Sequence, residues 1–104
     1  MYRGTTPTIV LNVTGENFTG DTVYVTLQQE NHKITKTGSD LNITPDGDDA
    51  SIEVYFTQEE TLSFRRGYGL IQIRWIAADG TACASPIKKV DISPILQEGV
   101  IYYA

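Results

Sequence analysis

The stretch Leu70-Ile71-Gln72-Ile73-Arg74-Trp75-Ile76-Ala77 decides the fold class of this 104-residue chain. Every second residue from Ile71 to Ala77 is apolar, and the positions between them include the polar residues Gln72 and Arg74. Side chains of a β-strand point alternately to opposite faces, so a hydrophobic period of two indicates a strand with one buried and one wet face. Burial on one face only is typical of antiparallel sheets.

The same period of two recurs along the chain. The other runs that alternate in this way, some long and some short, are Thr8–Thr14, Thr22–Gln28, Lys33–Thr37, Leu41–Ile43, Ala50–Phe56 and Ile87–Ile92. Turn-forming residues separate the runs, as in Pro45–Asp49 and in Asp79-Gly80, a dipeptide typical of tight hairpins. Strands and turns at this spacing predict a sandwich or a barrel.

One segment departs from the strand pattern. Thr57-Gln58-Glu59-Glu60-Thr61-Leu62 has the residues of a single helical turn, with Thr57 as N-cap and Glu60 three residues later. We expect this turn to cross between the two sheets and to bring Leu62 and Phe64 into the core. No long amphipathic helix is predicted anywhere in the sequence.

These patterns predict an all-β fold. We expect one antiparallel, immunoglobulin-like β-sandwich of about seven short strands, which occupies residues 1–104 as a single domain. The Cys…Trp…Cys framework of antibody domains is absent, because Trp75 and Cys83 are the only residues of their kinds. The expected likeness to immunoglobulins is therefore one of architecture only.

Composition restricts the classes of function. The formal net charge of −5 disfavours nonspecific binding to nucleic acid. The longest apolar run is the five residues Val100–Ala104, far shorter than a membrane-spanning helix needs, so no such helix is expected. The first residues lack the apolar core of a secretory signal peptide, so export by a signal peptide is not expected.

The residues with reactive side chains do not form a catalytic or metal-binding pattern. His32 lies in a polar turn, and Cys83 lies among small residues with no adjacent cation to lower its pKa. The cluster Asp46-Gly47-Asp48-Asp49 lacks the ligand spacing of a calcium loop, and adjacent carboxylates such as Glu59-Glu60 point in different directions. We therefore predict no enzyme activity, no metal and no cofactor.

Partner contacts are the remaining possibility, and two parts of the chain are candidates. The first is the basic and aromatic loop Arg65-Arg66-Gly67-Tyr68-Gly69. The second is the pair of chain ends. The apolar segment Ile95–Tyr103 could dock on its own sandwich, as a last strand or another docked segment, or it could pack on a neighbouring subunit. The resulting interface candidates are Tyr2, Arg3, Arg65, Arg66, Tyr68, Val100, Ile101, Tyr102 and Tyr103.

Several stretches together resemble a known family. They are Arg3–Thr8, Leu70–Trp75 followed by Asp79–Ala82, Ile95–Ile101, and the Thr-Gln-Glu-Glu-Thr step within Thr57–Leu62. In combination they are similar to short phage and prophage proteins of Gram-positive bacteria. More distantly, they resemble the N-terminal domain of phage upper baseplate proteins, a β-sandwich that attaches a receptor-binding apparatus to the tail.

The resemblance implies a noncatalytic structural or assembly protein of a phage or prophage particle, in its tail, baseplate or neck or as an accessory protein. The expected location is the virion, or the host cytoplasm during assembly. The protein's expected partners are other phage structural proteins and further copies of itself; nucleic acid and membranes are not expected partners, and small molecules are disfavoured. The alternative is a small module that binds a carbohydrate or a host protein, with Tyr24, Tyr55 or Tyr68 stacking on sugar rings.

Overall fold

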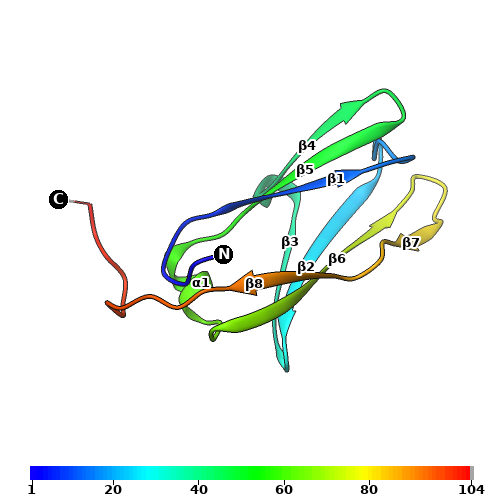
Figure 1. Cartoon of the computed structure of the whole chain (residues 1–104). Helices are drawn as coiled ribbons and strands as arrows, with labels where there is room; N and C mark the ends of the chain where they lie inside the picture. The colour runs from blue at the N-terminus through cyan, green and yellow to red at the C-terminus, as the bar shows by residue number, and fades with distance from the viewer. Residues whose placement is uncertain (104) are drawn as a thin grey trace.

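The computed structural model describes residues 1–103, in which eight strands and two short helical segments follow one another (Figure 1). The order is β1 (Thr8–Val13), β2 (Thr22–Gln29), β3 (His32–Thr37), the 3₁₀ turn η1 (Gly38–Asp40), β4 (Leu41–Asp46), β5 (Asp49–Tyr55), α1 (Gln58–Leu62), β6 (Gly67–Ile76), β7 (Ala82–Ala84) and β8 (Lys88–Ile92).

The strands form two packed antiparallel sheets, which confirms the predicted all-β sandwich. One sheet has the order β1-β5-β4, and the other has the order β3-β2-β6, with β7 and β8 both paired to the far side of β6. This arrangement corresponds to strands B, E and D facing strands C′, C, F and G of an immunoglobulin-like sandwich. In that correspondence β1 takes the place of strand B and forms an edge of the smaller sheet.

The inner faces of the two sheets supply the core, as the period-two pattern requires. Leu27, Ile52 and Val54 are fully buried, and side chains next to them on the same strands alternate between core and solvent. The other buried apolar residues are Phe18, Val23, Val25, Leu41, Ala50, Phe56, Phe64, Ile71, Ile73 and Ile92.

The strand count exceeds the expected seven because the last edge is interrupted. The pairing of β6 shifts by one residue between Arg74↔Ala84 and Ile71↔Lys88, so an extra residue is accommodated near Ser85. The Ser85 N–H donates to the Ile73 carbonyl oxygen over 2.8 Å, and its Oγ accepts the Ile73 N–H over 3.0 Å. This bulge separates β7, which the sequence pattern did not predict, from β8.

The predicted helical turn is present as α1 and connects the two sheets. Its capping box is complete, because Thr57 Oγ1 accepts the Glu60 N–H and the Glu60 carboxylate accepts the Thr57 N–H. Phe64 is buried as expected, but Leu62 is only partly buried and Thr61 takes the interior position. Thr61 is tolerated there because its Oγ1 donates to the Thr5 carbonyl oxygen and accepts the Thr5 N–H.

Candidate protein-interaction sites

The N-terminal residues are bound to the exit of β8. Tyr2 forms a parallel bridge with Ser93, the Arg3 N–H donates to the Ser93 carbonyl oxygen, and the Ser93 N–H donates to the Met1 carbonyl oxygen. This pairing satisfies backbone groups that would otherwise remain free at the end of β8. The side chain of Tyr2 remains exposed.

The guanidinium of Arg3 joins three parts of the chain. Its Nε donates to the Phe64 carbonyl oxygen over 2.6 Å and its Nη2 donates to the Leu62 carbonyl oxygen over 3.0 Å. Its Nη1 lies 2.7 and 2.8 Å from the two carboxylate oxygens of Glu98. Arg3, an expected partner contact, is thus engaged within its own chain, where it holds the base of the C-terminal segment against the end of α1.

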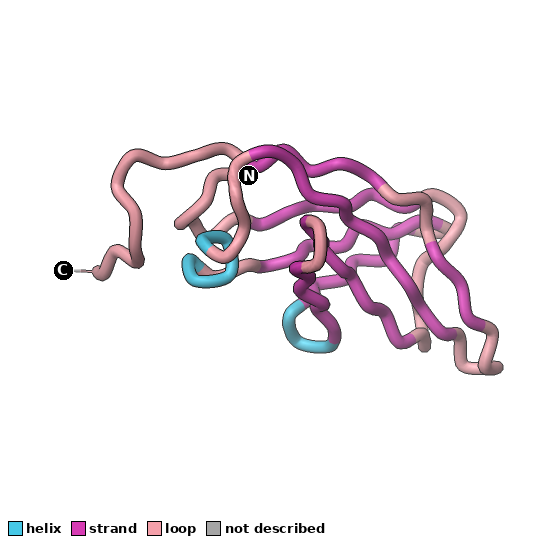
Figure 2. The backbone as a smooth tube through the Cα atoms, turned by 90° about the horizontal axis from the view of Figure 1, so that it is seen from below, coloured by secondary structure: helices cyan, strands magenta, loops and turns pink. Residues whose placement is uncertain are grey.

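The C-terminal segment Pro94–Tyr103, here called the tail, leaves the sandwich. In Figures 1 and 2 the tail extends from the end that carries α1 and the N-terminus, away from both sheets. It contains no strand, so it does not dock as a last strand of the sandwich. Leu96, Tyr102 and Tyr103 have exposed fractions of 106%, 87% and 104%. Such exposure of three large side chains within one ten-residue segment is unusual.

One polar contact holds the far part of the tail. The Gln58 side chain accepts the Ile101 N–H through Oε1 and donates to the Ile101 carbonyl oxygen through Nε2, both over 2.9 Å. This amide pairs with the Ile101 backbone as a neighbouring strand would. The tail is therefore tethered at Glu98 and Ile101, while its apolar side chains stay outside the core.

The loop that contains Arg65 and Arg66 lies next to the start of β6. The Gln29 amide holds this loop by accepting the Arg65 N–H and donating to the Arg65 carbonyl oxygen. Arg65 also pairs with Glu30, and Lys89 lies over the Tyr68 ring with its Nζ 4.5 Å from the ring centroid. Within residues 1–103, Arg66 forms no ion pair.

The structure gathers most of the expected contact residues at one end of the molecule. Arg3 bonds to the carbonyl oxygen of Phe64, the residue directly before Arg65, and Tyr2 pairs with Ser93 at the base of the tail. Figure 1 shows the N-terminus, α1 and the tail at this same end. Segments at opposite ends of the sequence thus form one continuous surface.

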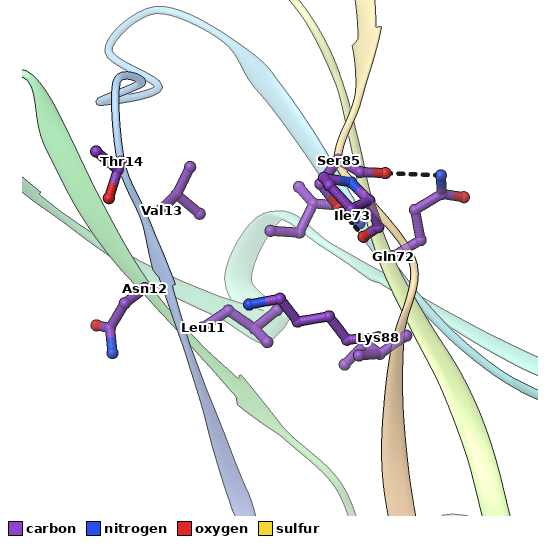
Figure 3. A pocket seen from close by; sticks show the side chains of 10 residues that line it. Leu11, Asn12, Val13, Thr14, Gln72, Ile73, Ser85 and Lys88 are labelled. Atoms are coloured by element: carbon purple, nitrogen blue, oxygen red, sulfur yellow. Dashed lines mark hydrogen bonds between the residues drawn. The ribbon is translucent and has the colours of Figure 1, made fainter.

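A second site, which the sequence pattern did not predict, is a groove between the two sheets. It has a volume of about 230 Å³ and opens between β1 and the bulge that separates β7 from β8 (Figure 3). Figure 3 shows the Lys88 side chain reaching from β8 toward Leu11 on β1. The residues that line the groove are Leu11, Asn12, Val13, Thr14, Ile71, Gln72, Ile73, Ser85, Pro86 and Lys88.

The groove lies beside the least protected sheet edge. Edge strand β3 carries an inward-pointing charge at Lys36, β4 contains Pro45, and the β7–β8 edge is broken at Pro86. Such features discourage the addition of another strand. Strand β1 has no charged residue, no proline and no bulge between Thr8 and Val13, so its outer edge can accept a partner strand.

The remaining reactive side chains have structural contacts. His32 lies against the buried Phe64 ring, and its Nε2 is 2.7 Å from Ser63 Oγ. Because the Ser63 hydroxyl donates its proton to the Glu60 carbonyl oxygen, Nε2 of His32 is the donor in their contact. Cys83 is half-buried on β7, opposite Trp75.

The acidic turn after β4 forms a hairpin and contacts the β1–β2 loop. Asp46 and Asp49 pair across a two-residue hairpin turn in which Gly47 has a φ of +60°. The Asp49 carboxylate accepts the Gly15 N–H, which connects this hairpin to the β1–β2 loop. Among residues 1–103, no three His, Cys, Asp or Glu side chains are placed to hold a metal ion.

No protein-family model and no curated protein matches the chain. Over residues 1–103, the helices are too short to cross a bilayer.

Proposed function

We propose that this protein is a noncatalytic structural or assembly protein of a phage or prophage particle, and that it acts through protein–protein contacts. The observation that supports this most directly is the tail, in which Leu96, Ile101, Tyr102 and Tyr103 are exposed to solvent. Exposed apolar side chains gathered in one segment are typical of a surface that a partner covers.

The tail has the properties of a segment that orders on a partner. Val100, Ile101, Tyr102 and Tyr103 are β-favouring residues, and only Ile101 has its backbone paired. An extended segment of this kind gains affinity by adding to a free sheet edge, where its backbone N–H and C=O groups find partners. The β1 edge of a neighbouring subunit, beside the apolar groove, is the acceptor that the fold offers.

Deletion of Val100–Ala104 tests this proposal. We expect the shortened protein to keep the β-sheet circular dichroism of the full chain, because no core residue is removed. We expect it to lose self-association in light scattering and to be lost from phage particles purified after prophage induction in the source strain. Mass spectrometry of these particles gives the readout.

Two further variants keep the test specific. Tyr102→Ser with Tyr103→Ser retains the backbone and removes the apolar surface, so it should reproduce the deletion. Ile87→Ser removes an exposed apolar side chain outside the tail and should have no effect. Full association of the deletion variant, or absence of the wild-type protein from purified particles, would contradict the proposal.

A second candidate function is the binding of a carbohydrate or a host protein. The outer face of the five-stranded sheet is hollowed beside Tyr24, Arg74 and Ile76, and aromatic rings next to polar groups are suited to sugars. Tyr68 is less available for stacking because Lys89 covers its ring. Binding to a glycan array that is lost in Tyr24→Ala would favour this function over assembly.

A further inference from the structure

The charges of this protein are divided between its two sheets. The strands of the smaller sheet, β1, β5 and β4, contain Asp46, Asp49 and Glu53 and no Lys, Arg or His. The strands of the larger sheet contain Asp91 as their one acidic residue and five Lys or Arg residues: Lys33, Lys36, Arg74, Lys88 and Lys89. An acidic protein thus carries one sheet with a basic excess.

Strand register places only part of these charges on the outer surfaces. On the larger sheet, Lys33, Arg74 and Lys89 point outward together with Asp91. Lys36 points into the core, and Lys88 points toward the groove.

On the larger sheet, Arg74 pairs with Tyr24 on one side and Ala84 on the other, and all three point away from the core. We call the outer surface around Arg74, with Lys33 and Lys89, the basic face. On the smaller sheet, Glu53 pairs with Val10 and Asn42, and these residues form the centre of the acidic face.

Among residues 1–103, the central charge of each face takes part in no ion pair. The ion pairs of residues 1–103 are Arg3–Glu98, Lys36–Glu60 and Arg65–Glu30. Arg74 is exposed, and Glu53 is half-buried and accepts a hydrogen bond from the Tyr55 hydroxyl over 3.0 Å. Each face therefore presents a charge that a second molecule is free to pair with.

Apolar side chains surround both central charges. Tyr24, Leu70 and Ile76 on the basic face have exposed fractions of 40%, 40% and 41%. Val10 and Tyr55 on the acidic face have exposed fractions of 54% and 41%. Apolar surface around a complementary pair of charges is the usual composition of a specific interface, because the apolar contacts provide affinity and the charges provide orientation.

We propose that the basic face of one copy packs on the acidic face of a second copy, with Arg74 opposite Glu53. This inference rests on the proposed function and names the partner of a surface that lies apart from the tail. The contact joins two different faces, so each copy can bind one neighbour on either side. Repetition of such a head-to-tail contact builds a ring when the rotation closes and a filament when it does not.

Charge reversal tests the contact. Glu53→Arg puts a positive charge at the centre of the acidic face, and Arg74→Glu puts a negative charge at the centre of the basic face. In light scattering on a sizing column, we expect each variant alone to associate at least about tenfold more weakly than the wild type. An equimolar mixture of the two should associate again, because each variant keeps the face that the other needs.

Controls separate this contact from other effects. Glu59→Arg changes the same type of residue at an exposed position on α1, outside both faces, and should leave association unchanged. Association of the wild type should be weaker in about 1 M than in about 0.1 M NaCl, because salt screens the paired charges. Circular dichroism establishes that both reversed variants are folded.

The outcomes distinguish this inference from the proposed function. Wild-type association of either reversed variant, or a mixture that stays monomeric while both variants are folded, would overturn the pairing of the two faces. If the pairing of the two faces is overturned but deletion of Val100–Ala104 still abolishes particle incorporation, the proposed function stands without that pairing. If only the charge variants lose association, the two faces form the contact and the role of the tail is wrong.

Discussion

The Nζ atom of Lys36 lies 2.7 Å from each carboxylate oxygen of Glu60, in a contact that joins edge strand β3 to α1. Lys36 is buried, with an exposed fraction of 8%, and its Nζ also lies 5.3 Å from the centroid of the Phe56 ring. Glu60 belongs to the capping box of α1 at the same time. One carboxylate therefore stabilises both the helical turn and the position of the turn against the larger sheet.

Replacement of Lys36 by Met should be destabilising. The variant keeps the apolar stem of the side chain but leaves the partly buried Glu60 carboxylate without its cation, so we expect a loss of about 1–3 kcal/mol in the free energy of unfolding. Urea unfolding followed by Trp75 fluorescence measures it. Lys33→Met, at an exposed position of the same strand, is the control and should change stability by less than about 0.5 kcal/mol. Equal unfolding midpoints for the two variants would contradict the role given to Lys36.

Stability should also fall in acid because of Glu60. Burial raises the pKa of its carboxyl, but hydrogen bonds from Lys36 and from the Thr57 N–H outweigh burial and hold the pKa below its ordinary value of 4.5. A depressed native pKa adds stability that is complete above the unfolded value and is lost as the pH falls through the native one. Urea midpoints between about pH 6 and about pH 3 should fall less steeply for Lys36→Met than for the wild type. Parallel pH profiles would show that another carboxylate causes the loss.

Phe18 is expected to be a major stabilising residue although it lies in a loop. Its ring is buried and packs edge-on against Trp75, with the ring centroids 5.2 Å apart, and its backbone has a φ of +61°. Phe18→Ala should cost about 3–5 kcal/mol and shift the Trp75 fluorescence to longer wavelength as water reaches the indole. Phe18→Leu should lose less, because it refills most of the space. A fluorescence maximum that stays unchanged in Phe18→Ala would argue against the contact.

Gly69 should be intolerant of even a methyl group. It is buried in β6, and a Cβ atom there would lie 3.0 Å from Leu27 Cδ1 and 3.3 Å from the Gln28 carbonyl oxygen. Because the carbonyl belongs to the adjacent strand, it cannot move without disturbing the sheet, so Gly69→Ala should cost about 1–3 kcal/mol. Thermal unfolding measures this against Leu70→Ala, a change at the neighbouring exposed position. An equal effect of both substitutions would mean that the sheet adjusts at this point.

The strands and the helical turn could be predicted because their signals are local. The alternation from Ile71 to Ile76 reappears as the buried and exposed faces of β6, and Thr57 and Glu60 form the expected capping box. The interior position of Thr61 in place of Leu62 could not be predicted. It depends on hydrogen bonds to Thr5, a residue far away in the sequence.

The candidate sites likewise divide into those that the sequence could predict and those that it could not. The basic loop and the apolar tail are visible as composition, and the structure adds that Arg3 ties both to one end of the molecule. The groove beside β1 and the basic and acidic faces had no signal in any single segment. They arise because Leu11 comes to lie opposite Ile71 and Ser85, and because Glu53 and Arg74 belong to different sheets.

By itself, the sequence determined the class of fold, the main strands, the capped turn and the apolar composition of the chain end. Each of these follows from side-chain periodicity or from contacts between residues a few positions apart. Only the tertiary structure decided which strands became edges, where the tail lies, and that opposite charges occupy opposite faces. Those properties depend on the order in which strands pair, and long-range pairing is set by the packing of the whole core rather than by any one segment.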